Sequence, residues 1–83
     1  MAIKIHPHAR ERMKERGATE EEVTSTIRDG EKFSAKFGRA GFRRNFTCDA
    51  LWKGKRHKTK QIEVFGVKER DDFIVVTVLV KYY

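Results

Sequence analysis

Three side chains that could act on a phosphodiester are spaced four residues apart near the start of the chain. They are His8, Arg12 and Arg16. On a helix this spacing places all three within about 80° of one another. Arginine binds phosphate through its planar fork, and a histidine near a helix N-terminus is pushed toward its neutral form, which accepts protons. The row therefore supplies the base and the cations that metal-free RNA cleavage requires.

The general acid for the departing 5′-oxygen is left open by the sequence. Candidates are His57, Lys60, Tyr82 and Tyr83. A lysine, a tyrosine or a protonated imidazole can each donate a proton to a leaving oxygen.

A purely structural interpretation of the same row is also open. In it His8 caps or packs, and the two arginines pair with acids such as Glu22 or Asp49. Since Ala9 and Met13 occupy the adjoining stripe, the row borders the face that packs on the rest of the protein.

A second group of cations predicts a surface that follows a nucleic-acid backbone. The run from Lys53 to Lys60 is strongly basic, adjoins Trp52 and is preceded by another basic pair. We assign nucleic-acid binding to Arg43, Arg44, Lys53, Lys55, Arg56 and Lys58. Strand alternation would bring Lys58 and Lys60 out on a common side. One alternative is a solvated hairpin whose charges only prevent edge-to-edge pairing with other strands. For Trp52, the alternative to stacking on a nucleobase is to cover one end of the core.

The distribution of charge points to the same middle segment. The chain has 83 residues, with 19 Lys and Arg against 12 Asp and Glu, giving a formal net charge of +7. Residues 1–32 carry seven basic and seven acidic groups, residues 33–62 nine and one, and residues 63–83 three and four. A concentrated positive segment favours a polyanionic partner, with nucleic acid first, or an acidic protein.

Several protein classes are excluded by composition. With Cys48 as the single cysteine, an intramolecular disulfide is impossible, and we expect a small buried thiol. No spacing among His6, His8, His57 and Cys48 suits zinc, so no metal or cofactor is expected. The longest apolar run, 73–80, is far shorter than the roughly 20 residues that span a bilayer, and the N-terminus lacks a signal-peptide pattern. We therefore expect a cytoplasmic protein without membrane association.

The elements that position these residues follow from periodicity and capping signals. We predict a short strand at 3–5, a helix from Pro7 to Arg16 ended by Gly17, and a second helix begun by a capping box and ended at residues 29–30. Strands are expected at 33–37, 42–51, 57–67 and 73–82, paired antiparallel because their connections are short. The prediction is one α+β domain over residues 1–83.

Four runs carry a family resemblance. They are His8-Ala9-x-x-Arg12-Met13-x-x-Arg16-Gly17 and the segments 20–23, 60–64 and 74–78. Together they resemble a widespread group of small prokaryotic domains that is similar to the RelE/BrnT-like toxins. The resemblance implies a RelE-like α+β fold, with two N-terminal helices packed on an antiparallel sheet of three to five strands. It also implies a ribonuclease toxin with a cognate antitoxin, and its catalytic positions map to His8, Arg12, Arg16 and Lys60.

Two functional hypotheses result. The first is a toxin-like RNA endonuclease that cleaves mRNA without a metal. The alternative is a non-catalytic module with the same surface that binds nucleic acid or an acidic protein.

Overall fold

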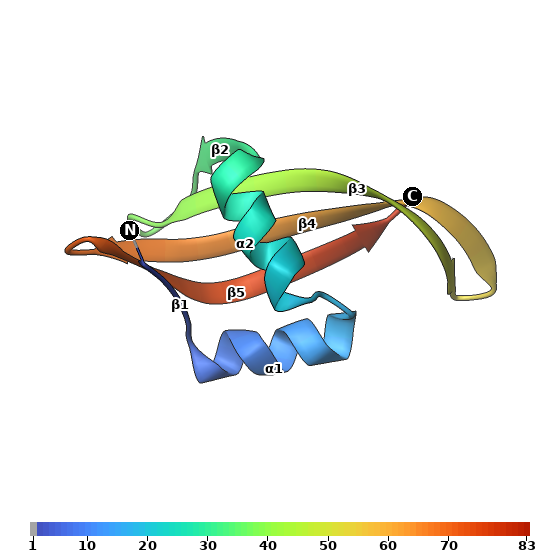
Figure 1. Cartoon of the computed structure of the whole chain (residues 1–83), viewed down its shortest axis with the longest axis horizontal. Helices are drawn as coiled ribbons and strands as arrows, with labels where there is room; N and C mark the ends of the chain where they lie inside the picture. The colour runs from blue at the N-terminus through green and yellow to red at the C-terminus, as the bar shows by residue number, and fades with distance from the viewer. Residues whose placement is uncertain (1) are drawn as a thin grey trace.

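The computed structural model describes residues 2–83, and for Trp52 it describes the backbone alone. The described residues form one five-stranded sheet and two helices (Figure 1). In chain order the elements are β1 (Ala2–Ile5), α1 (Pro7–Arg16), α2 (Glu20–Asp29), β2 (Glu31–Ser34), β3 (Ala40–Trp52), β4 (Lys55–Glu69) and β5 (Asp72–Tyr82).

Both helices begin and end where the sequence predicts. The α1 N-terminus has Pro7 in its first turn, and the helix ends at Gly17, which adopts a left-handed conformation with φ 76°. Helix α2 starts with a capping box in which the Glu22 N–H donates to the Thr19 hydroxyl at 3.1 Å and the Thr19 N–H donates to the Glu22 carboxylate at 2.9 Å. These interactions stay within one turn, so they form wherever the helix packs.

The predicted RelE-like arrangement, with two N-terminal helices on an antiparallel sheet, is wrong. The helices lie between β1 and β2, and the sheet is mixed, with strand order β1-β5-β4-β3-β2. Strand β1 runs parallel to β5, with Ala2 opposite Asp72 and Ile5 opposite Val75. Short connections impose antiparallel pairing only among β2, β3, β4 and β5. Almost the whole chain separates β1 from β5, so no short connection constrains their relative direction. The α+β class itself holds.

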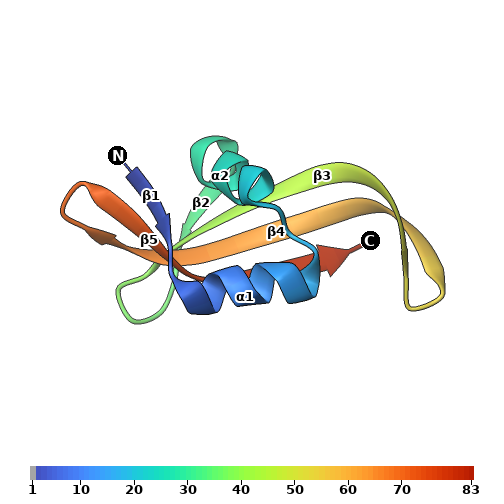
Figure 2. The same ribbon diagram turned by 60° about the horizontal axis from the view of Figure 1, so that its bottom comes forward.

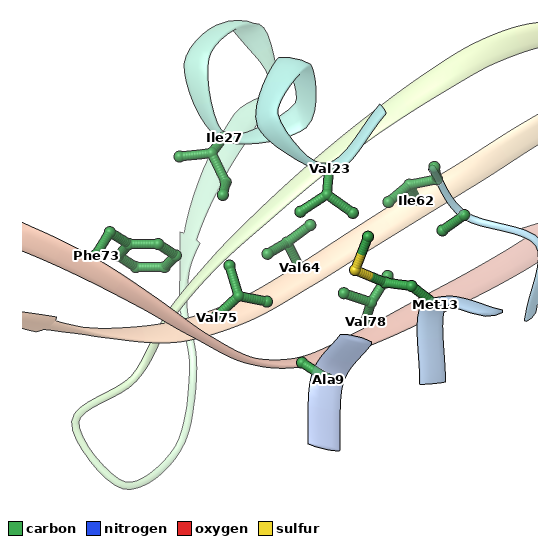
Figure 3. Packing of buried hydrophobic residues seen from close by; sticks show 10 residues of the cluster. Ala9, Met13, Val23, Ile27, Ile62, Val64, Phe73, Val75 and Val78 are labelled. Carbon is green, nitrogen blue, oxygen red and sulfur yellow. The ribbon is translucent and has the colours of Figure 1, made fainter. Parts of the chain in front are cut away.

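A single core fills the space between the helices and one face of the sheet (Figure 3). Helix α1 packs on β5, and α2 crosses β4 and β3. Apolar residues from both helices meet inward-facing strand residues in the figure, namely Ala9, Met13, Val23, Ile27, Ile62, Val64, Phe73, Val75 and Val78. The opposite sheet face has no helix over it in the described chain, and its apolar side chains, Phe65 and Val67 among them, stay half-buried.

The β3–β4 hairpin extends beyond the rest of the sheet (Figures 1 and 2). Pairing of β2 with β3 ends at Arg43, and pairing of β5 with β4 ends at Lys60. Apart from Lys58, whose N–H donates to the Tyr83 carbonyl at 3.0 Å, residues 48–58 therefore form a two-stranded ribbon, which we call the basic arm. It contributes to the elongated dimensions of the molecule, 43 × 24 × 22 Å. Neither helix in residues 2–83 is long and apolar enough to cross a membrane.

Candidate nucleic-acid interface

The basic arm is shaped by its turn and by an irregularity at its base. At the tip, Lys53 and Gly54 both have positive φ, 51° and 78°, the combination found in two-residue hairpin turns that match strand twist. At the base, the register of β3 against β4 shifts between Thr47 and Ala50. Such a bulge bends and twists a hairpin, so the arm can leave the plane of the sheet.

Four of the predicted phosphate-binding residues are exposed on this arm. They are Lys53, Lys55, Arg56 and Lys58. Arg56 forms an ion pair with Asp49, the single acid of the arm, at 2.7 Å, and both side chains are well exposed. The three lysines make no ion pair within the described residues. The arm therefore presents cations that a phosphate backbone could reach without breaking buried contacts.

Arg43 and Arg44 lie elsewhere and on opposite faces of the sheet, because neighbouring strand residues alternate. Arg43 stacks over the Phe33 ring at 4.7 Å and lies 3.7 Å from the Glu31 carboxylate. Arg44 faces α2, where it bonds to the Ser25 hydroxyl and lies 3.7 Å from Asp29. Both arginines thus have intramolecular partners, and they do not join the four arm cations in one surface.

The predicted row on α1 is present, but its members have different surroundings. His8 is exposed, and its backbone N–H donates to the His6 ring at 3.1 Å. Arg12 pairs with Glu15 one turn along the helix, at 3.1 Å. The Arg16 guanidinium donates to the Val78 carbonyl of β5 at 2.6 Å.

The contact made by Arg16 stabilises an open sheet edge. Strand β1 pairs with β5 only as far as Val75, so Val78 lies on the stretch of edge beyond it. An unpaired carbonyl at such an edge needs a donor, and Arg16 provides one from the end of α1. Arg16 is therefore part of the helix–sheet junction.

Lys60, the fourth predicted catalytic residue, lies under α2. Its ammonium donates to the Gly17 carbonyl and forms an ion pair with the Glu22 carboxylate at 2.9 Å. The Lys60 side chain is 11% exposed and that of Glu22 23% exposed. The prediction that Lys58 and Lys60 both emerge is therefore wrong for Lys60: Lys58 is exposed, whereas Lys60 is covered by its contacts with Gly17 and Glu22.

The pair also changes the acidity of the carboxyl group. Burial of Glu22 raises its pKa, but hydrogen bonds from the Thr19 backbone and from Lys60, with the lysine charge, outweigh the burial and leave the pKa below the ordinary value. Glu22 therefore both caps α2 and anchors it to β4.

Two proton-transfer candidates meet at the base of the arm. The rings of His57 and Tyr82 lie 6.0 Å apart, tilted by 46°. The Tyr82 hydroxyl is 3.5 Å from the carbonyl oxygen of Arg16. We call His57, Tyr82 and Arg16 the junction cluster. The sequence named His57 and Tyr82 as separate candidates for the acid. Their ring contact depends on the long-range pairing of β5 with β4, which sets Tyr82 opposite Lys60, three residues from His57.

The described residues hold no group of three or more His, Cys, Asp or Glu side chains suited to a metal ion. Cys48 is half-buried, and its thiol lies 3.7 Å from the His57 carbonyl oxygen. The Trp52 side chain, a possible stacking platform, lies outside the described part of the structure.

Comparison with known proteins identifies a family, and that family has no known activity. A search of the curated proteins and a search of the solved structures each found no similar protein. The family model described as a domain of unknown function, DUF4258, matches residues 5–80, from the end of β1 into β5. Since this match covers nearly the whole chain, the protein belongs to the DUF4258 family.

Proposed function

We propose that this protein binds RNA through the basic arm. The observation that carries the proposal is the protrusion of a two-stranded ribbon with four exposed cations and one acid. A phosphate backbone that contacts such a ribbon releases condensed counterions, and this release drives binding without sequence preference. The exposed lysine side chains need no rearrangement of the core to reach phosphates.

The choice of RNA is supported by the α1 motif. The run from His8 to Gly17 is one of the four that resemble a group of small prokaryotic domains, and that group is similar to the RelE/BrnT-like toxins, which include ribonucleases. By the same resemblance, a cognate antitoxin is a candidate protein partner. This part of the proposal rests on sequence alone.

A second candidate function, metal-independent RNA cleavage, is favoured by the junction cluster. The His57 ring belongs to the arm and the Tyr82 ring lies 6.0 Å from it, so RNA held by the arm would pass close to both. In this reaction the 2′-oxygen loses its proton to a base and attacks phosphorus, and the 5′-oxygen leaves with a proton from an acid. Within the junction cluster, His57 can take one of these roles and Tyr82 the other. His8 precedes Arg16 by eight residues on α1, about 12 Å along the helix, so it would act as the base only for a phosphodiester bound on α1 itself.

Binding is tested by fluorescence anisotropy with labelled single-stranded RNA, duplex RNA and duplex DNA of one sequence, titrated at several salt concentrations. The arm variant replaces Lys53, Lys55 and Lys58 by Gln. The control variant replaces three exposed lysines outside the arm, Lys14, Lys32 and Lys68, and so removes the same charge.

For single-stranded RNA, loss of three phosphate contacts lowers the slope of log K against log salt by about 2. We expect this in the arm variant and little change in the control. Equal weakening of both variants would mean that net charge alone drives binding, and the proposal would be abandoned. Tighter binding of duplex DNA than of either RNA would assign the arm to DNA.

Cleavage is tested separately, by incubating labelled RNA with the protein in the presence of a chelator. We expect His57→Ala and Tyr82→Phe to abolish the products while leaving affinity nearly unchanged. Loss of cleavage only in the His8→Ala, Arg12→Ala variant would instead place the chemistry on α1. Intact RNA with the wild-type protein removes the second function and leaves binding.

A further inference from the structure

The loop between β2 and β3 contains an aromatic residue in an unfavourable position. Phe37 has φ 61° and the following Gly38 has φ 69°, the backbone of a turn that asparagine and glycine adopt far more readily. The Phe37 side chain is also 88% exposed. Folding gains little from a phenylalanine that is both strained and exposed. Backbone strain of this kind, kept at an exposed residue, points to a binding role.

Phe37 stands beside a groove on the sheet face that carries no helix. The groove has a volume of about 310 Å³ and is lined by Ala35, Lys36, Phe37, Arg39, Phe65 and Thr77. Phe65 and Thr77 are paired across β4 and β5 and form its floor. Figure 2 shows the loop on the side of the sheet away from α2.

Cations flank this apolar groove. Lys36 and Arg39 are exposed at the two ends of the turn, and neither forms an ion pair with any described residue. An apolar hollow between two unpaired cations is complementary to a large apolar side chain with carboxylates on either side.

We propose that this groove docks an acidic segment of a partner protein, with one aliphatic or aromatic side chain seated between Phe37 and Phe65. Carboxylates of the segment pair with Lys36 and Arg39. This site lies on a different surface from the basic arm, and the inference does not rest on the proposed RNA binding.

Two other occupants fit less well. A second copy of the chain would bring another net charge of +7 to the contact and set like charges against Lys36 and Arg39. A nucleobase carries donors and acceptors around its edge, and the only lining side chains among the described residues that could pair with them are the Thr77 hydroxyl and the two cations, Lys36 and Arg39. An apolar side chain requires no such partners.

The test selects binders from a phage-displayed library of random peptides, using the immobilised wild-type protein. Selected peptides are synthesised, and their affinities are measured for the wild type and two variants. Phe37→Asn removes the anchor and relieves the strained turn. Leu51→Asn is the matched control, because Leu51 is also a large exposed apolar residue, 73% exposed, but lies on the arm.

We expect selected peptides that place a large apolar residue among Asp and Glu, and a loss of affinity of at least tenfold with Phe37→Asn but not with Leu51→Asn. A Lys36→Gln, Arg39→Gln variant should weaken the same peptides. Because asparagine suits the turn, Phe37→Asn should melt at or above the wild-type temperature, which separates lost binding from lost folding.

Three outcomes would overturn the proposal. They are selection of no peptides, selection of peptides without the acidic and apolar bias, and equal effects of Phe37→Asn and Leu51→Asn. A parallel selection from a random single-stranded RNA library covers the other class of ligand. If RNA, and not peptide, depends on Phe37, the groove is a nucleobase site.

Discussion

The placement of Lys60 under α2 leads to a sharp test of which cations belong to the fold. Replacing Lys60 by Met keeps the buried aliphatic stem but removes the ammonium that bonds to Glu22 and to the Gly17 carbonyl. A hydrogen bond to a charged group contributes about 1.5–3 kcal/mol, and Lys60 makes two. Glu22 keeps its Thr19 donors and some solvent exposure, so we expect a loss of about 2 kcal/mol in the free energy of unfolding.

The measurement is urea unfolding followed by far-UV circular dichroism, together with RNA titration of the same samples. Lys58→Met is the matched control, since Lys58 is exposed on the same strand. We expect Lys60→Met to lose stability and keep its affinity for RNA, and Lys58→Met to show the reverse. A Glu22→Gln variant and the double variant complete a cycle, with a coupling energy of about 1 kcal/mol. Unchanged stability with lost affinity in Lys60→Met would refute the structural role.

Three further predictions concern stability. The hydrogen-bond donors around Glu22 outweigh its burial and lower its pKa. The stability that the Glu22 carboxylate contributes is therefore complete above the unfolded value near 4.5 and is lost as pH falls through the folded pKa. Glu22→Gln should flatten the acid side of a plot of Tm against pH. Arg16→Met should cost about 1–2 kcal/mol in urea unfolding, because the β5 edge carbonyl loses its donor, and an unchanged midpoint would contradict this. Phe37→Asn should gain about 1 kcal/mol by relieving the left-handed turn, whereas a lower midpoint would show that Phe37 supports the fold.

Local signals predicted the helices and turns well. The capping box at Thr19 and Glu22, the left-handed Gly17 and the Lys53-Gly54 turn each involve residues within four positions of one another. Their energies do not depend on where the element docks, so they can be recognised before any tertiary contact is known. The bounds of both helices were accordingly confirmed.

The pairing of strands that lie far apart in the sequence could not be predicted from such local signals. The parallel contact of β1 with β5 joins residues about 70 positions apart, and short connections elsewhere carry no information about it. Similarly, the alternation of β4 placed Lys60 on the side of Ile62 but could not show that α2 covers that side. A lysine on the face covered by α2 needs an acidic partner for its charge. Glu22 lies close enough to Lys60 to be that partner only because α2 packs on β4.

The same reasoning divides seven of the nine cations of residues 33–62 into two groups, and the other two, Lys36 and Arg39, lie beside the groove at Phe37. Lys60, Arg43 and Arg44 each have an intramolecular partner, an acid, an aromatic ring or a hydroxyl, that would have to be released before phosphate could bind. The three arm lysines have no ion-pair partner among the described residues. Arg56 would give up only its ion pair with Asp49, which is exposed, in order to bind phosphate. Breaking the buried Lys60–Glu22 pair costs more than displacing solvent, and Arg43 and Arg44, although partly exposed, would also lose a ring or hydroxyl contact. We therefore expect a polyanion to bind most favourably at the arm. We therefore expect the proposed RNA-binding surface to be smaller than the sequence suggested and to lie on the arm, and we expect the sheet face without helices to stay accessible to the proposed protein partner.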